Sequence, residues 1–147
     1  MKILFDTSVL VAALVDSHAH HSVAFSWLVK VRRHEVEGYI ATHTLAELYA
    51  ILTSLPVQQK VSTTEVWQLI QNSVLPIFEV VPLTKDDYQE VLESLSEADI
   101  RGGAVYDALI AHAAVKAKVD KLLTYNSKHF RKVYPAISTF IEEPMSP

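Results

Sequence analysis

The sequence contains no cysteine among its 147 residues. This absence excludes disulfide bonds and thiolate chemistry, and it fits a protein of a reducing compartment. No apolar run is long enough to span a membrane. The start, Met1 to Phe5, is mostly apolar, but Asp6 interrupts the run and no small-residue cleavage site of a signal peptide follows. We therefore expect a soluble cytoplasmic protein with no membrane partner.

The sequence also lacks an excess of positive charge, because its formal net charge is −4. Its charges are unevenly distributed, however. Six acidic residues lie between Asp86 and Asp99, and six basic residues lie between Lys116 and Lys132 against the single acid Asp120. A basic segment on an acidic protein can still bind a polyanion. Such runs are at least as often solvated helix faces, so both interpretations stay open.

Internal repeats, linkers and low-complexity segments are absent as well, so the length predicts one domain over residues 1–147 with a polar tail at 142–147. Apolar runs typical of buried strands alternate with helical patterns. We expect strands at 2–6, 38–42, 76–81 and 121–125, with a fifth at 136–141, and helices at 9–15, 19–33, 44–54, 62–75, 84–98 and 103–116. This alternation predicts an α/β fold with a mostly parallel sheet of four to five strands.

Capping residues indicate where some of these helices begin. Asp16 and Ser17 can cap the helix at 19–33. Ser62 and Glu65 have the spacing of a capping box, in which the two side chains bond each other's backbone N–H groups.

The helix at 103–116 has apolar residues on nearly every face, which is typical of a helix buried in a core. Asp107 lies in its first half. A buried carboxylate without a partner is too unfavourable to be retained without a cation, a set of hydrogen bonds or a functional cleft. Asp107 is therefore the first candidate for a functional residue.

Three further polar residues can converge with Asp107. Asp6 ends the first predicted strand, Asn126 follows the fourth, and Glu47 lies in the first turns of a helix that follows a strand. Ligands of parallel sheets bind beyond the carboxyl ends of the strands. Clustered carboxylates repel one another unless a cation joins them, and Mg²⁺ prefers oxygen ligands. The pattern indicates metal-assisted hydrolysis of a phosphodiester.

Each of these residues also has a structural interpretation. Glu47 follows Thr44 at the spacing of a capping box, and Asp6 can cap the helix that begins near Ser8. Asp107 gains some stabilisation from the dipole of its helix, and Asn126 is a common turn residue.

Four motifs, taken in order, resemble the PIN-domain family and within it the VapC toxins of bacterial toxin–antitoxin pairs. They are Ile3-Leu-Phe-Asp-Thr-Ser-Val-Leu10, Thr42-His-Thr-Leu-Ala-Glu-Leu-Tyr-Ala50, Tyr106-Asp-Ala-Leu-Ile-Ala111 and Leu122-Leu-Thr-Tyr-Asn-Ser-Lys-His-Phe130. The resemblance covers essentially the whole chain. It implies a three-layer α/β/α sandwich and a Mg²⁺- or Mn²⁺-dependent ribonuclease that leaves a 3′-hydroxyl and a 5′-phosphate.

The same resemblance assigns partners and residue roles. It implies a homodimer and a VapB-like antitoxin protein that blocks the site. Asp6, Glu47 and Asp107 match the metal-binding acids of the family, and Thr7 and Ser8 match the polar residues beside the first acid. Thr124 and His129 belong to the last motif, and we expect them near the substrate or behind the acids.

The sequence departs from the family pattern at Asn126, where many members carry a fourth acid. An amide oxygen brings no charge, so a second tightly bound metal ion is not assured. The departure leaves open a non-catalytic RNA- or protein-binding module with weakened metal affinity. A phosphotransferase that uses Asp6 as its nucleophile is a third possibility, but such enzymes need a second Asp two residues later, where this chain has Ser8.

Overall fold

The computed structural model describes residues 1–146, and its centre is a sheet of five strands. The strands lie in the spatial order β3-β2-β1-β4-β5, and every neighbouring pair is parallel. Their bounds are β1 (Lys2–Phe5), β2 (Glu37–Ala41), β3 (Phe78–Val81), β4 (Lys121–Leu123) and β5 (Ile141–Glu142). The carboxyl ends of all five strands therefore lie along one edge, and the predicted parallel α/β sheet is confirmed.

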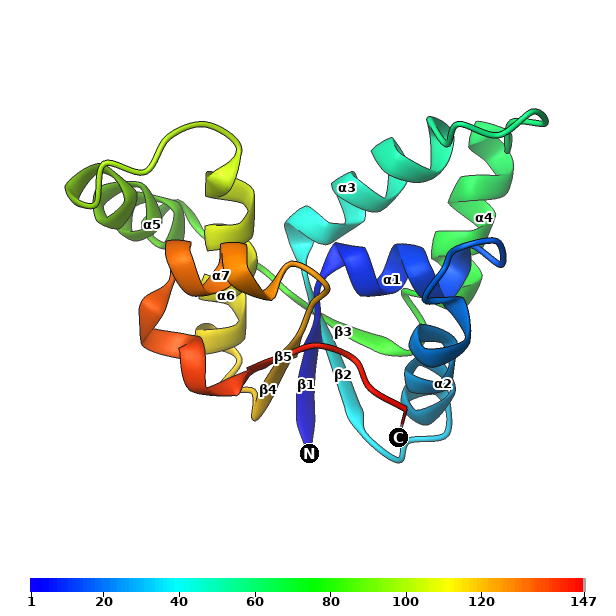
Figure 1. The fold of residues 1–147 in the computed structure, drawn as a ribbon, viewed down its shortest axis with the longest axis horizontal. Helices are drawn as coiled ribbons and strands as arrows, with labels where there is room; N and C mark the ends of the chain where they lie inside the picture. The colour runs from blue at the N-terminus through cyan, green and yellow to red at the C-terminus, as the bar shows by residue number, and fades with distance from the viewer. Residues whose placement is uncertain (147) are drawn as a thin grey trace.

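Helices cover both faces of this sheet, as Figure 1 shows, so the expected three-layer α/β/α sandwich is confirmed. One layer contains α1 (Thr7–Leu14), α2 (His21–Arg32), α3 (Thr42–Thr53) and α4 (Thr63–Ser73). The other contains α5 (Lys85–Glu97), α6 (Ala104–Lys116), α7 (Ser127–Val133) and the 3₁₀ helix η1 (Pro135–Phe140). The alternation of side chains along β1 feeds both layers, because Ile3 and Phe5 pack toward the first and Leu4 toward the second.

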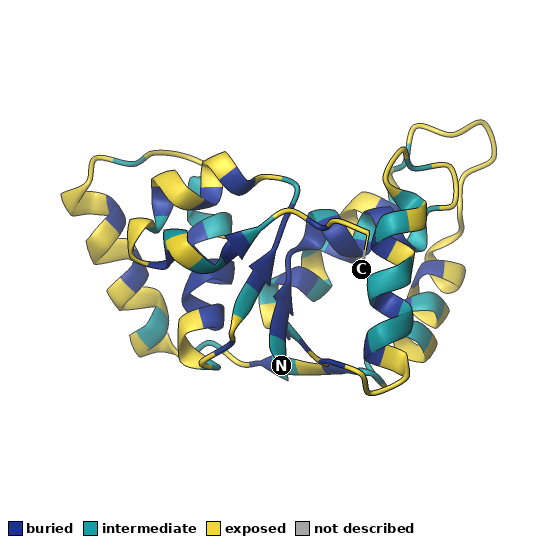
Figure 2. Cartoon of the chain, turned by 60° about the horizontal axis from the view of Figure 1, so that its bottom comes forward, coloured by how far each residue is buried: buried dark blue, intermediate teal, exposed yellow. Residues whose placement is uncertain are grey.

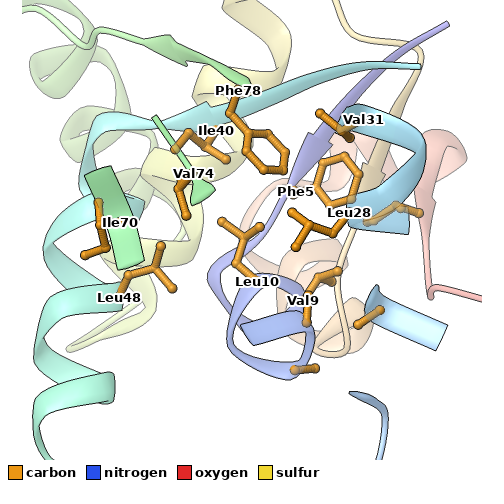
Figure 3. Close-up of a cluster of buried hydrophobic side chains, with 14 of the residues drawn as sticks. Phe5, Val9, Leu10, Leu28, Val31, Ile40, Leu48, Ile70, Val74 and Phe78 are labelled. Atoms are coloured by element: carbon orange, nitrogen blue, oxygen red, sulfur yellow. The ribbon is translucent and has the colours of Figure 1, made fainter. Parts of the chain in front are cut away.

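The core beneath the first layer is closely packed around Phe5 of β1 (Figure 3). The rings of Phe5 and Phe78 meet edge to face, with their centroids 5.2 Å apart. Gly38 of β2 permits this packing, since a Cβ atom there would lie 2.7 Å from the Phe78 ring. The exposed residues lie mainly on the outer faces of the helices and in the loops (Figure 2). This packing fixes the strand ends at which the candidate acids lie.

Helix α6 is the buried helix that the sequence predicts. Every residue from Ala108 to Ala114 is buried, and Asp107 lies in the first turn. Among the described residues, no helix combines the length and the apolar character needed to cross a membrane.

Two helix starts differ from the prediction. Neither Asp16 nor Ser17 caps α2, which begins at His21 after two successive turns over residues 15–20. Helix α3 begins at Thr42, directly after β2, with Ala41 as its N-cap. Thr44 therefore lies inside the helix, and the capping box predicted for Thr44 and Glu47 is wrong. The box of Ser62 and Glu65 is confirmed.

The C-terminal part also differs from the prediction. Helix α7 is not predicted by the sequence pattern, and residues 135–140 form η1 where a strand is expected. Pro135 stands directly before the predicted strand, and its fixed φ angle suits the first turn of a helix, which is where η1 begins. Only Ile141 and Glu142 join the sheet, so the predicted strand at 136–141 is mostly wrong. The predicted tail at 142–147 therefore begins too early. Pro147 lies outside the described residues.

Candidate functional site

Asp6 lies at the centre of the candidate site, immediately after β1. It is the N-cap of α1 and is 3% exposed. Its Oδ2 atom accepts hydrogen bonds from Ser8 Oγ at 2.6 Å, from Ser8 N at 3.3 Å and from Thr124 Oγ1 at 2.8 Å. Burial raises the pKa of Asp6, and these hydrogen bonds only partly oppose it. Asp6 is thus a helix cap, and it is also a buried carboxylate beside the strand ends.

Glu47 extends toward Asp6 from the first half of α3. Its Oε1 atom accepts a hydrogen bond from Thr7 Oγ1 at 2.9 Å, and His43 Nε2 lies 3.7 Å from the same oxygen. Burial raises the pKa of Glu47, and the charge of Asp6 raises it further. Since its hydrogen bond goes to Thr7 and not to a cap at Thr44, Glu47 has no role in starting its helix.

Asp107 completes the group from α6, on the other side of the sheet. Its pKa is raised to about 6 by burial first, and then by the charges of Asp6 and Glu47. His129 partly opposes this shift. The three carboxylates therefore lie close enough to repel one another, although they come from residues 6, 47 and 107 of the chain.

No lysine or arginine among the described residues forms an ion pair with any of these three acids. A crowded set of carboxylates without a protein cation is suited to a small divalent ion, which takes oxygen ligands. As the side chains lie, no three Asp, Glu, His or Cys residues within 1–146 already enclose a cation position. The oxygen atoms of the three carboxylates fit a metal ion as ligands, although one oxygen of Glu47 already accepts a hydrogen bond from Thr7.

The remaining predicted site residues fall into two groups. Thr7, Ser8 and Thr124 bond the acids directly, as described above. Asn126 is exposed and is the N-cap residue of α7. Only its backbone N–H reaches this network, by donating to Thr124 Oγ1 at 2.9 Å. The strand end thus places Thr124, rather than the side chain of Asn126, against Asp6.

His129 lies with Asp107 in the wall of a cavity of about 590 Å³. This cavity is formed by the loop after α5, the start of α6 and one face of α7. The sequence motifs indicate neither the cavity nor its other basic residues, Arg101 and Lys132, because three separate segments build it.

A stacked pair of rings at the edge of the site, His43 and Tyr106, was not predicted from the sequence. The ring of His43 stacks on that of Tyr106, with centroids 4.7 Å apart and an angle of 4° between the planes. His43 stands four residues before Glu47 in α3, and that helical spacing is a signal that could have identified it.

Comparison of the sequence and of the fold with known proteins identifies the same family. A model of the PIN domain matches residues 3–135. Ribonuclease VapC27 of Mycobacterium tuberculosis is 31% identical over 116 residues, which is 78% of each chain. Ribonuclease VapC40 of the same species is 33% identical over 119 residues, covering 81% of this chain and 82% of the relative. A chain in the crystal structure of VapBC2 from Rickettsia felis, which is bound to a DNA fragment from the VapBC2 promoter, has the same fold. The TM-score is 0.65 at 20% sequence identity, and the match covers 97% of this chain and 98% of that one.

Proposed function

The chain belongs to the PIN domain family and to the VapC ribonucleases within it, and on this basis we propose that it hydrolyses RNA phosphodiesters as the toxin of a toxin–antitoxin pair. The observation that carries the proposal is the convergence of Asp6, Glu47 and Asp107 at the carboxyl ends of β1 and β4. These acids lie in one PIN-type domain, which we extend over residues 1–147.

Asp6, Glu47 and Asp107 would hold one Mg²⁺ or Mn²⁺ ion. Such an ion supplies Lewis-acid chemistry, since it makes water more acidic and neutralises charge that develops on the phosphate. Ser8 and Thr124 orient the Asp6 carboxylate, and Thr7 orients that of Glu47. Asn126 and His129 lie at the rim, where we assign them contacts with the substrate. Hydrolysis of the phosphodiester would leave a 5′-phosphate and a 3′-hydroxyl.

The partners follow from the same family. We assign the chain an antitoxin protein of the VapB type, because a structural neighbour is a VapBC complex. We also expect a homodimer, and a cytoplasmic location where RNA is accessible.

An RNA cleavage assay tests this function. The protein should cleave single-stranded RNA when Mg²⁺ or Mn²⁺ is present and should stop when EDTA is added. Asp107→Asn should lower the cleavage rate by at least about a hundredfold, since it removes one charged ligand. Glu93→Gln, on the exposed side of α5, is the matched control and should cleave normally. Cleavage that persists in EDTA, or in the Asp107→Asn variant, would contradict the proposal.

A further inference from the structure

The cavity beside the acids shares only one residue with them, which is Asp107. Its walls are the loop at 98–103, the first turn of α6 and the face of α7 that carries His129 and Lys132. The loop is exposed along most of its length (Figure 2) and lies on the same side of the sheet as α6 and α7 (Figure 1). A chain bound at Asp107 can therefore continue directly into this cavity.

The cavity combines an apolar interior with basic side chains. Val133 is buried, and Ile100 and Ala104 pack partly buried beside it. Arg101, His129 and Lys132 also line the cavity, together with the acids Asp99 and Asp107. His129 and Lys132 stand three residues apart on α7, so they share one face of that helix. Apolar surface with a few convergent polar groups is typical of a site for an organic ligand.

The basic side chains are largely available for a ligand. Within residues 1–146, the side chains of His129 and Lys132 form no hydrogen bond or ion pair with the protein. Among the described residues Arg101 pairs only with Asp99, two residues before it, through Nη2 at 3.1 Å, and both side chains are mostly exposed. An exposed pair of this kind contributes little stability, so a phosphate can replace Asp99 at low cost.

The volume of about 590 Å³ lies within the range of roughly 300–1,000 Å³ found for small-molecule pockets. That volume accommodates one nucleotide. The protein has a net charge of −4, and three carboxylates lie together at the site without a lysine or arginine partner among the described residues, so an RNA backbone needs local cations to stay bound.

From these observations we infer that the cavity is a nucleotide-binding subsite next to the acids. It takes the nucleotide adjacent to the phosphate that is cleaved, with Arg101, His129 and Lys132 on its phosphate and the base over Ile100 and Val133. The inference rests on the proposed ribonuclease function. It adds that the bound RNA strand runs from the three acids into this cavity.

Binding of a short, fluorescently labelled single-stranded RNA tests the inference. It is measured by anisotropy in EDTA, over a series of salt concentrations, so that no cleavage takes place. Arg101→Gln and Lys132→Gln should each weaken binding by roughly three- to tenfold and lower the salt slope by about 0.7, the value for one contact with single-stranded RNA. Asp99→Asn should instead strengthen binding, because it releases Arg101.

Two matched controls separate a local contact from overall charge. Lys128→Gln changes an exposed lysine of the same helix that does not line the cavity, and Glu93→Gln removes an acid from the outer side of α5. Both should leave the salt slope unchanged. In cleavage assays, Arg101→Gln and Lys132→Gln should raise KM and leave kcat close to that of the parent, as expected for a contact made equally in the ground state and the transition state.

The possible failures are distinguishable. If the parent binds and cleaves RNA while Arg101→Gln and Lys132→Gln keep its affinity and salt slope, the subsite is wrong and the ribonuclease proposal stands. If the parent neither binds nor cleaves RNA, both proposals are wrong. Competition by a polyglutamate peptide as effective as that by RNA, at equal ionic strength, would assign the cavity to an acidic protein segment and overturn the nucleotide subsite.

Discussion

At the scale of single residues, hydroxyl groups rather than cations hold the carboxylates of the site in place. Ser8 and Thr124 donate to Asp6, and Thr7 donates to Glu47. These bonds lower the pKa values of both acids, but burial outweighs them and the net shift is upward. Charge on these carboxylates in the metal-free protein therefore opposes its folding.

The stability of the Asp107→Asn variant should reveal this cost. Because the pKa of Asp107 is raised from 3.8 to about 6 in the folded state, the folded protein binds the proton more tightly than the unfolded chain. The free energy of unfolding therefore falls as the pH rises between these two values. We expect Asp107→Asn to be more stable than the parent near pH 7 and to lose this advantage near pH 4.

The advantage near pH 7 is at most about 3 kcal/mol, at about 1.4 kcal/mol for each unit of pKa difference, and solvent screening of this partly exposed carboxylate reduces it. Urea unfolding of both proteins in EDTA at the two pH values measures the effect. An equal difference in unfolding free energy at both pH values would show that the Asp107 carboxylate is not destabilising.

At the scale of helices, a second polar network joins α5, α6 and the segment after α7, apart from the acids. Asp87 forms a capping box with Thr84 at the start of α5. Its Oδ1 atom accepts from His112 Nε2 at 3.1 Å, and its Oδ2 atom pairs with Lys116. The other ring nitrogen of His112 lies 3.2 Å from the hydroxyl of Tyr134. The hydrogen bond from Lys116, followed by that from the Thr84 backbone, lowers the pKa of Asp87.

Asp87→Asn should therefore destabilise the protein without affecting the acids directly. An amide accepts weakly from Lys116 and also loses the charge that favours the N-terminus of α5, so we expect a loss of about 1–2 kcal/mol near pH 7, in the range found for helix caps. Because the folded-state pKa is lowered, the difference between parent and variant should shrink as the pH falls below the ordinary value of 3.8.

Chemical denaturation at several pH values tests this prediction. The control is Asp86→Asn, which changes the neighbouring exposed acid. A variant as stable as Asp86→Asn near pH 7 would mean that the network does not stabilise the contact between α5 and α6.

At the scale of the whole molecule, long apolar patterns made the layers predictable. The buried strands at β1 and β2 and the helix with Asp107 are unambiguous in sequence because burial on both faces leaves no polar alternation. Helix α7 and most of β5 were missed, since β5 has two residues and α7 has seven, too few for a periodic pattern. Strand β4 has only three residues, but it was found because its apolar pair lies between a charged and a polar segment. The Thr44–Glu47 spacing was misleading, because the same spacing occurs inside α3.

The acids of the site could be proposed from sequence because Asp6 ends a strand, Glu47 lies early in a helix that follows a strand, and Asp107 interrupts an apolar helix. Their hydroxyl partners Thr7, Ser8 and Thr124 came only from the family motifs. The cavity with Arg101 and Lys132 could not be proposed, since it depends on how the loop after α5 lies against α7. His43 was missed although its spacing from Glu47 was visible.

If Asp6, Glu47 and Asp107 hold one divalent ion, that ion must stabilise the folded protein, and the stabilisation must depend on the three acids. Thermal unfolding of the parent, Glu47→Gln and the control Glu93→Gln is followed in EDTA and in Mg²⁺ or Mn²⁺. In EDTA, Glu47→Gln should melt at or above the parent, since Gln retains an oxygen for Thr7 and removes a repelling charge.

A metal ion at a hundredfold excess over its dissociation constant should stabilise the parent and Glu93→Gln by about 2.7 kcal/mol, and Glu47→Gln much less. An equal gain of stability from the metal in Glu47→Gln and the parent, or no gain in the parent, would show that these acids do not hold the ion.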